Sequence, residues 1–185
     1  MAVNKYNKDY RLHEEFLANG KIRMRSEYIG SPYYFKCGAD KVHTEKKRAL
    51  LLILAAGAAF IAALIPYSEA MHRLWVALPF AFSVLPIFLT GDLVVSMQKW
   101  TEPMEHRQAD KLNNKYPPVT LAVMYLEAVS LIADAVFLVM NGAHTAGDFV
   151  LPACMAFILA CGFLLFRKRT SFAAEAGSGR AAKTK

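Results

Sequence analysis

Three acidic residues lie inside long apolar stretches of this chain, and their side chains are the best placed to do chemistry. Asp92 lies in the second stretch, and Glu127 and Asp134 lie in the third. A charged aspartate at the centre of a membrane helix costs about 2.5–3.5 kcal/mol, so such acids must face a protein interior, water or a partner. Carboxyl groups in that position can relay protons, bind cations or join helices by hydrogen bonds.

The third stretch has a polar stripe. Thr120, Glu127, Asp134 and Asn141 follow one another at intervals of seven residues. A helix drifts only about 20° over seven residues, so these side chains share one face. Counting about 1.5 Å per residue, Asp92 and Glu127 lie roughly 8 Å and 12 Å from the inner ends of their stretches. We therefore expect these two acids to meet, with Asp134 above them.

The stripe has two interpretations, and the sequence leaves both open. The first is a polar seam, in which protonated or hydrogen-bonded acids join helices within the bundle or to another subunit. The second is a proton or cation relay through Glu127, Asp134 and Asp92. Intramembrane acids are candidates for function by default.

Other chemistry finds no support in the sequence. The apolar stretches contain no Lys, Arg or His that could activate a nucleophile. The chain has no glycine-rich phosphate loop, nucleophile elbow or Cys-x-x-Cys motif, and its five histidines show no metal-ligand spacing. We expect no catalytic residues, no metal site and no cofactor.

Four apolar stretches set the fold class. A bilayer core of about 30 Å needs about 20 helical residues, and each stretch is near that length. The sequence predicts an all-α integral membrane protein with four transmembrane helices in a bundle. The predicted spans are 49–67, 74–97, 119–140 and 149–166, with a cytoplasmic loop over 98–118.

Positive charge predicts the orientation. Residues 1–48 carry 11 Lys and Arg, residues 98–118 carry 4, and the tail from Arg167 carries 6, whereas the two short connections share only Arg73. Positively charged loops stay in the cytoplasm. We expect a multi-pass protein of the cell membrane with both termini cytoplasmic. The +7 net charge then suits anionic headgroups of the lipid bilayer, and nucleic acid is not an expected partner.

The ends of the chain are expected to be polar and cytoplasmic. Residues 1–48 form a juxtamembrane segment, in which Tyr10–Asn19 predicts a short helix and a Gly-Ser-Pro turn at 30–32 predicts a β-hairpin. Its tyrosines suit either the membrane surface or a partner protein. The tail, 167–185, is rich in Ala, Gly, Ser and Lys and is expected to be disordered.

These features favour an accessory or interaction protein of the membrane, such as a transporter-associated subunit. Its partner would be another membrane protein or a second copy of the chain. The alternative is a small proton- or cation-coupled transporter that uses its intramembrane carboxylates.

Overall fold

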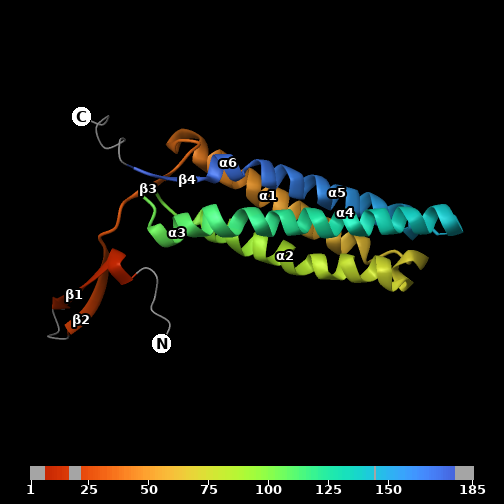
Figure 1. The fold of residues 1–185 in the computed structure, drawn as a ribbon, viewed down its shortest axis with the longest axis horizontal. Helices are drawn as coiled ribbons and strands as arrows, with labels where there is room; N and C mark the ends of the chain where they lie inside the picture. The colour runs from red at the N-terminus through yellow and green to blue at the C-terminus, as the bar shows by residue number, and fades with distance from the viewer. Residues whose placement is uncertain (1–6, 17–21, 144, 178–185) are drawn as a thin grey trace.

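Four long helices lie side by side along most of the molecule (Figure 1). The computed structural model describes residues 7–16, 22–143 and 145–177. The long helices are α1 (Ala39–Ala63), α2 (Leu74–Gln98), α4 (Tyr116–Asn141) and α5 (Gly147–Arg167). Helices α1 and α4 each pack against α2 and α5, so the chain forms an up-down-up-down bundle. The prediction of a mainly helical four-helix fold is confirmed at this level.

The bundle interior follows a repeat of seven residues. The buried residues of α4 are Tyr116, Thr120, Val123, Glu127, Ser130, Asp134 and Phe137. Those of α2 include Val76, Phe80, Ser83, Ile87, Thr90, Val94 and Met97. Alternating steps of four and three keep a helix's core residues facing its neighbours, as in bundles with coiled-coil-like packing. The polar residues of both helices thus occupy core positions.

In the part of the chain that the structure describes, three helical segments are long and apolar enough to cross a membrane, rather than four. They are Leu74–Gln98, His106–Asn141 and Gly147–Phe172. The expected first span at 49–67 fails because α1 begins at Ala39, ends at Ala63 and carries Lys46, Lys47 and Arg48. Its apolar part after Arg48 is only about 22 Å long at 1.5 Å per residue.

A π-helical turn, η3 (Lys111–Lys115), joins the short helix α3 (His106–Asp110) directly to α4. The helical chain therefore continues without a break through Asn113 and Asn114. Pro117 and Pro118 lie in the first turn of α4 and offer no amide hydrogens to the preceding carbonyls. A local change to π-helical hydrogen bonding lets the helix continue across this point.

The short N-terminal helix predicted at Tyr10–Asn19 is wrong where the structure describes it. Strand β1 (Tyr10–Phe16) pairs antiparallel with β2 (Ile22–Tyr28), and residues 17–21 lie outside the described part. Tyr10 and Leu12 alternate with the polar residues Arg11 and His13, which suits a strand. The register also sets Arg11 opposite Glu27, a favourable cross-strand charge pair. A β-hairpin is present, and β2 is the strand predicted before the turn at 30–32, but β2 pairs with β1 instead of with the strand that follows the turn.

The tail beyond Arg167 is ordered as far as it is described, which corrects the expected disorder. It forms α6 (Arg169–Phe172) and β4 (Ala174–Ala176), which pairs with β3 (Tyr33–Phe35). Phe172 is 1% exposed and packs edge-on against Phe35 and Tyr116. This aromatic contact and the pairing of β4 with β3 hold the tail against the rest of the structure, while residues 178–185 lie outside the described part.

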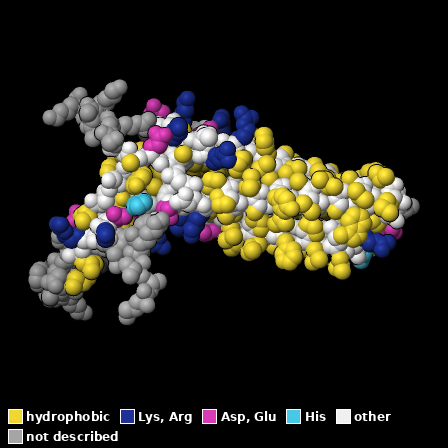
Figure 2. Space-filling view, in the orientation of Figure 1, with side chains coloured by type: hydrophobic (Ala, Val, Ile, Leu, Met, Phe, Trp, Pro, Cys, Tyr) yellow, Lys and Arg dark blue, Asp and Glu magenta, His cyan; other side chains and the backbone are white. Residues whose placement is uncertain are grey.

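The face of the bundle seen in Figure 2 is largely apolar along its length. Phe88 and Val139 are 72% and 88% exposed, and many other large apolar side chains are also exposed. Charged side chains gather at the end that carries the strands, with a few at the opposite tip (Figure 2). We call these the strand end and the far end. The latter holds the 3-10 turn η2 (Glu69–His72) and the start of α5.

Candidate functional site

Glu127 lies fully buried between α4 and α2. Its Oε1 is 2.5 Å from Oγ of Ser83, which is also fully buried. The same Oγ lies 2.7 Å from the carbonyl oxygen of Phe80 in its own helix. Both side chains occupy core positions of the seven-residue pattern, and this brings them together across the interface. The contact is a polar link inside an otherwise apolar interface.

The geometry around Ser83 suits a neutral Glu127. A serine hydroxyl has one hydrogen and can donate it to only one of its two neighbours. If Ser83 donates to the Phe80 carbonyl, its contact with Glu127 is a hydrogen bond only when Glu127 donates a proton. In addition, Oε2 of Glu127 has no hydrogen-bond partner among the described residues. An ionised group without partners is far more costly to bury than a neutral one.

Asp134 lies two turns further along α4 toward the far end. It is fully buried, and neither carboxyl oxygen has a hydrogen-bond partner in the described part of the chain. Asp148 is an acidic neighbour that acts on Asp134 electrostatically, and like charges in a poorly solvated region repel each other.

Asp148 begins α5 and ties the two connections at the far end together. Its Oδ1 accepts hydrogen bonds from Ser68 Oγ at 2.8 Å and from the amide of Glu69 at 3.3 Å. Its Oδ2 accepts one from the amide of Thr145 at 2.8 Å. Gly147 allows this approach, because a Cβ there would lie 1.9 Å from the carbonyl oxygen of Tyr67. The carboxylate therefore acts as a structural clamp.

The other buried hydroxyls do not connect the acids. Thr90 donates to the carbonyl of Pro86, and Thr120 is 3.0 Å from the carbonyls of Tyr116 and Pro117. Ser130, which lies between Glu127 and Asp134 in sequence, donates to the carbonyl of Leu126. Each hydroxyl thus serves its own helix. Among the described residues, no chain of hydrogen bonds leads from Glu127 to Asp134.

Asp92 does not join the other two acids. It lies nine residues after Ser83, and at about 100° per residue it points to the opposite side of α2. Its side chain is exposed and lines a surface pocket with Lys111 and Lys115. Asn141, the last member of the polar stripe, is also exposed. The structure therefore keeps Thr120, Glu127 and Asp134 inside the bundle and separates them from Asp92.

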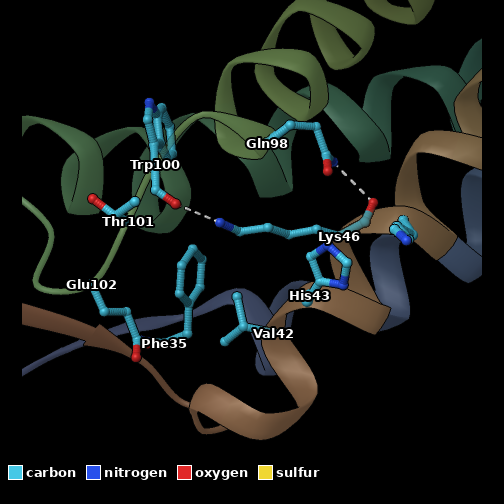
Figure 3. Close-up of a pocket in the computed structure, with 9 residues that line it drawn as sticks. Phe35, Val42, His43, Lys46, Gln98, Trp100, Thr101 and Glu102 are labelled. Atoms are coloured by element: carbon cyan, nitrogen blue, oxygen red, sulfur yellow. Dashed lines mark hydrogen bonds between the residues drawn. The ribbon is translucent and has the colours of Figure 1, made fainter.

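A second polar cluster, at the strand end, was not anticipated (Figure 3). Lys46 is 6% exposed, and its Nζ donates to the carbonyl of Trp100 at 2.6 Å and lies 4.8 Å from the centre of the Phe35 ring. Gln98 donates to the carbonyl of Lys46 at 3.0 Å. Burial lowers the pKa of Lys46, and the negative charge of Glu102 opposes this effect. Lys46 thus fastens α1 to the end of α2.

These clusters limit the chemistry. Among the described residues, no three His, Cys, Asp or Glu side chains gather closely enough to hold a metal ion. Glu127 and Asp134 are buried protonatable groups, which suits proton binding or helix packing. No family model, curated protein or solved structure matches this chain.

Proposed function

We propose that the chain is an integral membrane protein and that all four long helices cross the bilayer. The distribution of side chains supports this: Glu127 and Asp134 are fully buried, while Phe88 and Val139 lie on the surface. Such an arrangement is stable in hydrocarbon and unfavourable in water. The fourth crossing would be α1, whose Leu51 is 67% exposed. Thinning of the bilayer and snorkelling of flanking lysines accommodate a short apolar segment.

The strand end is then the cytoplasmic end. It carries both described ends of the chain and the connection between α2 and α4, which hold most of the Lys and Arg. The far end carries short connections with few positive charges. The positive-inside rule assigns the strand end to the cytoplasm of the cell membrane.

We further propose that the protein is an accessory subunit that docks a membrane-protein partner through its strand end. The observation that carries this proposal is the assembly of that end from three distant parts of the chain. Tyr33 exchanges backbone hydrogen bonds with Met104, and β3 pairs with β4 from the tail. A disordered or merely solvated loop would not need this cross-linking.

The hairpin of β1 and β2 is held in place against α3. Tyr10 donates to Oε2 of Glu105 at 2.5 Å, and burial together with this hydrogen bond raises the pKa of Tyr10 to about 12. The Tyr28 hydroxyl accepts from the amide of His106 at 2.9 Å, and Tyr33 stacks on the His106 ring. The hairpin therefore extends from the bundle in a defined direction (Figure 1).

This hairpin exposes apolar side chains at the strand end, away from the apolar outer surface of the bundle. Leu12 and Met24 are 69% and 61% exposed. The register places Leu12 opposite Ser26 and Glu14 opposite Met24, so Leu12 and Met24 lie on the same face of the hairpin. Exposed apolar groups on an ordered strand pair are typical of a protein contact surface.

The alternative function is a small proton- or cation-coupled transporter. The observation that favours it is the burial of three carboxyl oxygens, Oε2 of Glu127 and both of Asp134, without hydrogen-bond partners. Groups of this kind are candidate proton carriers. The absence of a hydrogen-bonded path between them in the described residues makes the accessory function the better supported of the two.

The test is a purification from native membranes in mild detergent. The wild-type chain is compared with the double variant Leu12→Lys, Met24→Lys and with Arg11→Gln, a control on the other face of β1. We expect one membrane protein to co-elute with the wild type and the control but not with the double variant. All three should remain in the membrane fraction after a carbonate wash.

Co-elution of the same proteins with the wild type, the control and the double variant would contradict docking by the hairpin. Release of the wild-type chain by the carbonate wash would contradict the membrane assignment itself.

A further inference from the structure

Asp92 is an exposed acid on the apolar outer surface of the bundle. It lies six residues before Gln98, the last residue of α2, and therefore about 9 Å from the cytoplasmic end of that helix. Leu89 and Val95, on the same helix, are also exposed. In a bilayer this carboxylate would sit just below the headgroups, where an isolated charge is unfavourable. A polar or positively charged group must therefore solvate or neutralise the Asp92 carboxylate.

The surroundings of Asp92 form a pocket of about 370 Å³ between α2 and the start of α4. This is within the usual size range of small-molecule sites. Its polar side chains are Asp92, Lys111, Asn114 and Lys115, and its apolar ones are Leu89, Leu93, Pro118 and Val119. One half of the pocket thus suits a polar headgroup and the other half suits hydrocarbon.

The two lysines are the first and last residues of the π-helical turn η3. Such turns occur frequently at functional sites, because they change the directions of side chains relative to a regular helix. Here the turn supplies both cations of the pocket. Lys111 Nζ lies 6.0 Å from the centre of the Trp100 ring, and within the described chain neither lysine forms an ion pair with Asp92.

One carboxylate and two ammonium groups therefore line a common hollow without neutralising one another. A ligand that matches them carries a negative group for the lysines and a positive group for Asp92. An acyl chain on the same ligand would lie along Leu89, Leu93 and Val119. The ligand chemistry is that of a zwitterionic phospholipid with a primary amine.

We propose that this pocket binds the headgroup of an aminophospholipid of the phosphatidylethanolamine class in the cytoplasmic leaflet. Lys111 and Lys115 contact the phosphate, and the ammonium group donates hydrogen bonds to Asp92. A choline headgroup has no N–H to donate to the carboxylate, and a glycerol headgroup has no positive charge for it. The inference rests on the proposed membrane location of the chain.

The experiment measures which lipids stay with the full chain. The purified protein is reconstituted in vesicles with equal amounts of phosphatidylethanolamine, phosphatidylcholine and phosphatidylglycerol, extracted again in mild detergent, and its retained lipids are quantified by mass spectrometry. We expect the ethanolamine lipid to be enriched about three- to tenfold over the choline lipid, the range for one charge-assisted hydrogen bond at a partly exposed site.

The variants separate the two halves of the headgroup. Asp92→Asn should abolish the preference for ethanolamine over choline headgroups while phospholipid is still retained. The double variant Lys111→Gln, Lys115→Gln should lower retention of all three lipids, and Lys99→Gln, an exposed lysine outside the pocket, should change nothing.

Equal retention of the three lipids by the wild type, or an unchanged preference in Asp92→Asn, would overturn this proposal. Failure of the chain to insert into the vesicles at all would instead contradict the membrane assignment. Circular dichroism of each variant confirms that a loss of lipid is not a loss of fold.

Discussion

Replacement of Glu127 by glutamine tests whether the buried contact with Ser83 is a polar seam. Glutamine keeps the shape of the side chain and can still hydrogen-bond to Ser83, but it cannot exchange a proton. If Ser83 loses this contact, its hydroxyl keeps the Phe80 carbonyl as an acceptor at 2.7 Å, so no donor is left unpaired. The loss of stability should therefore be at the low end for a buried hydrogen bond.

The expected size of the loss in stability follows from the second acceptor of the Ser83 hydroxyl, the carbonyl oxygen of Phe80. Hydrogen bonds between membrane helices average about 0.6 kcal/mol in double-mutant cycles and reach about 1.7 kcal/mol. We expect a coupling of at most about 0.6 kcal/mol between Glu127→Gln and Ser83→Ala, because glutamine can keep part of the contact. The free energy of unfolding is measured in mixed micelles of mild detergent and dodecyl sulfate for both single variants and the double variant. Ser130→Ala is the matched control, because Ser130 donates only to Leu126 of its own helix and should show no coupling.

Two results would refute this reasoning. A coupling above about 3 kcal/mol would exceed any simple hydrogen bond between membrane helices and would make Glu127 a central structural group. Loss of pH-driven ion or substrate uptake into vesicles by a folded Glu127→Gln protein would favour the transporter function. We expect neither, and we expect Asp134→Asn to fold and to keep the partner complex as well.

Two other predictions address the ends of the bundle. A reporter that is active only outside the cytoplasm should be inactive at the C-terminus and active when inserted within 141–148, and the reverse pattern would contradict the proposed orientation. At the strand end, Lys168 pairs with Glu45 and lowers its pKa below the value of 4.5 in the unfolded chain. This pairing stabilises the fold above pH 4.5 and is lost as the pH falls through the lower folded pKa. Lys168→Met should thus cost about 1 kcal/mol of unfolding free energy at pH 7 and much less at pH 3, whereas an equal cost at both pH values would exclude the ion pair as the cause.

Apolar length predicted three of the helices closely. The expected spans at 74–97, 119–140 and 149–166 correspond to Leu74–Gln98, Tyr116–Asn141 and Gly147–Arg167. Length is a reliable signal here because each segment is predominantly apolar. Apolar length did not predict the bounds of α1, because charged residues occupy its first turns and the helix begins well before its apolar part.

In α2, apolar residues surround the whole helix and do not indicate which of its faces is buried. No contrast in hydrophobicity distinguishes the buried side of α2 from the outer side, so the depth of Asp92 was a poor guide to its neighbours. The small polar residues held the missing information. Ser83 and Thr90 are seven residues apart and mark the buried face, which leaves Asp92 on the outer one.

The strand end was the least predictable part, because its contacts join residues far apart in the chain. Tyr33 pairs with Ala176 and Phe35 with Ala174, and three-residue strands have too little periodicity to reveal a partner. Lys46 illustrates the same limit. Its sequence neighbours indicate a solvated charged turn, whereas its ammonium group is buried against Trp100 and Phe35.

A polar pair in an apolar interface also has a consequence for the position of the helices. Apolar side chains pack in several registers, whereas a hydrogen bond between Ser83 and Glu127 forms in only one. A slip of α4 by one turn, about 5.4 Å, would leave the carboxyl group against apolar side chains without a partner. Single buried polar residues fix register in coiled coils for this reason. The α2–α4 register in turn sets where Lys111 and Lys115 lie relative to Asp92, since the lysines continue directly into α4. The buried seam and the proposed lipid pocket are thus connected through one rigid helix.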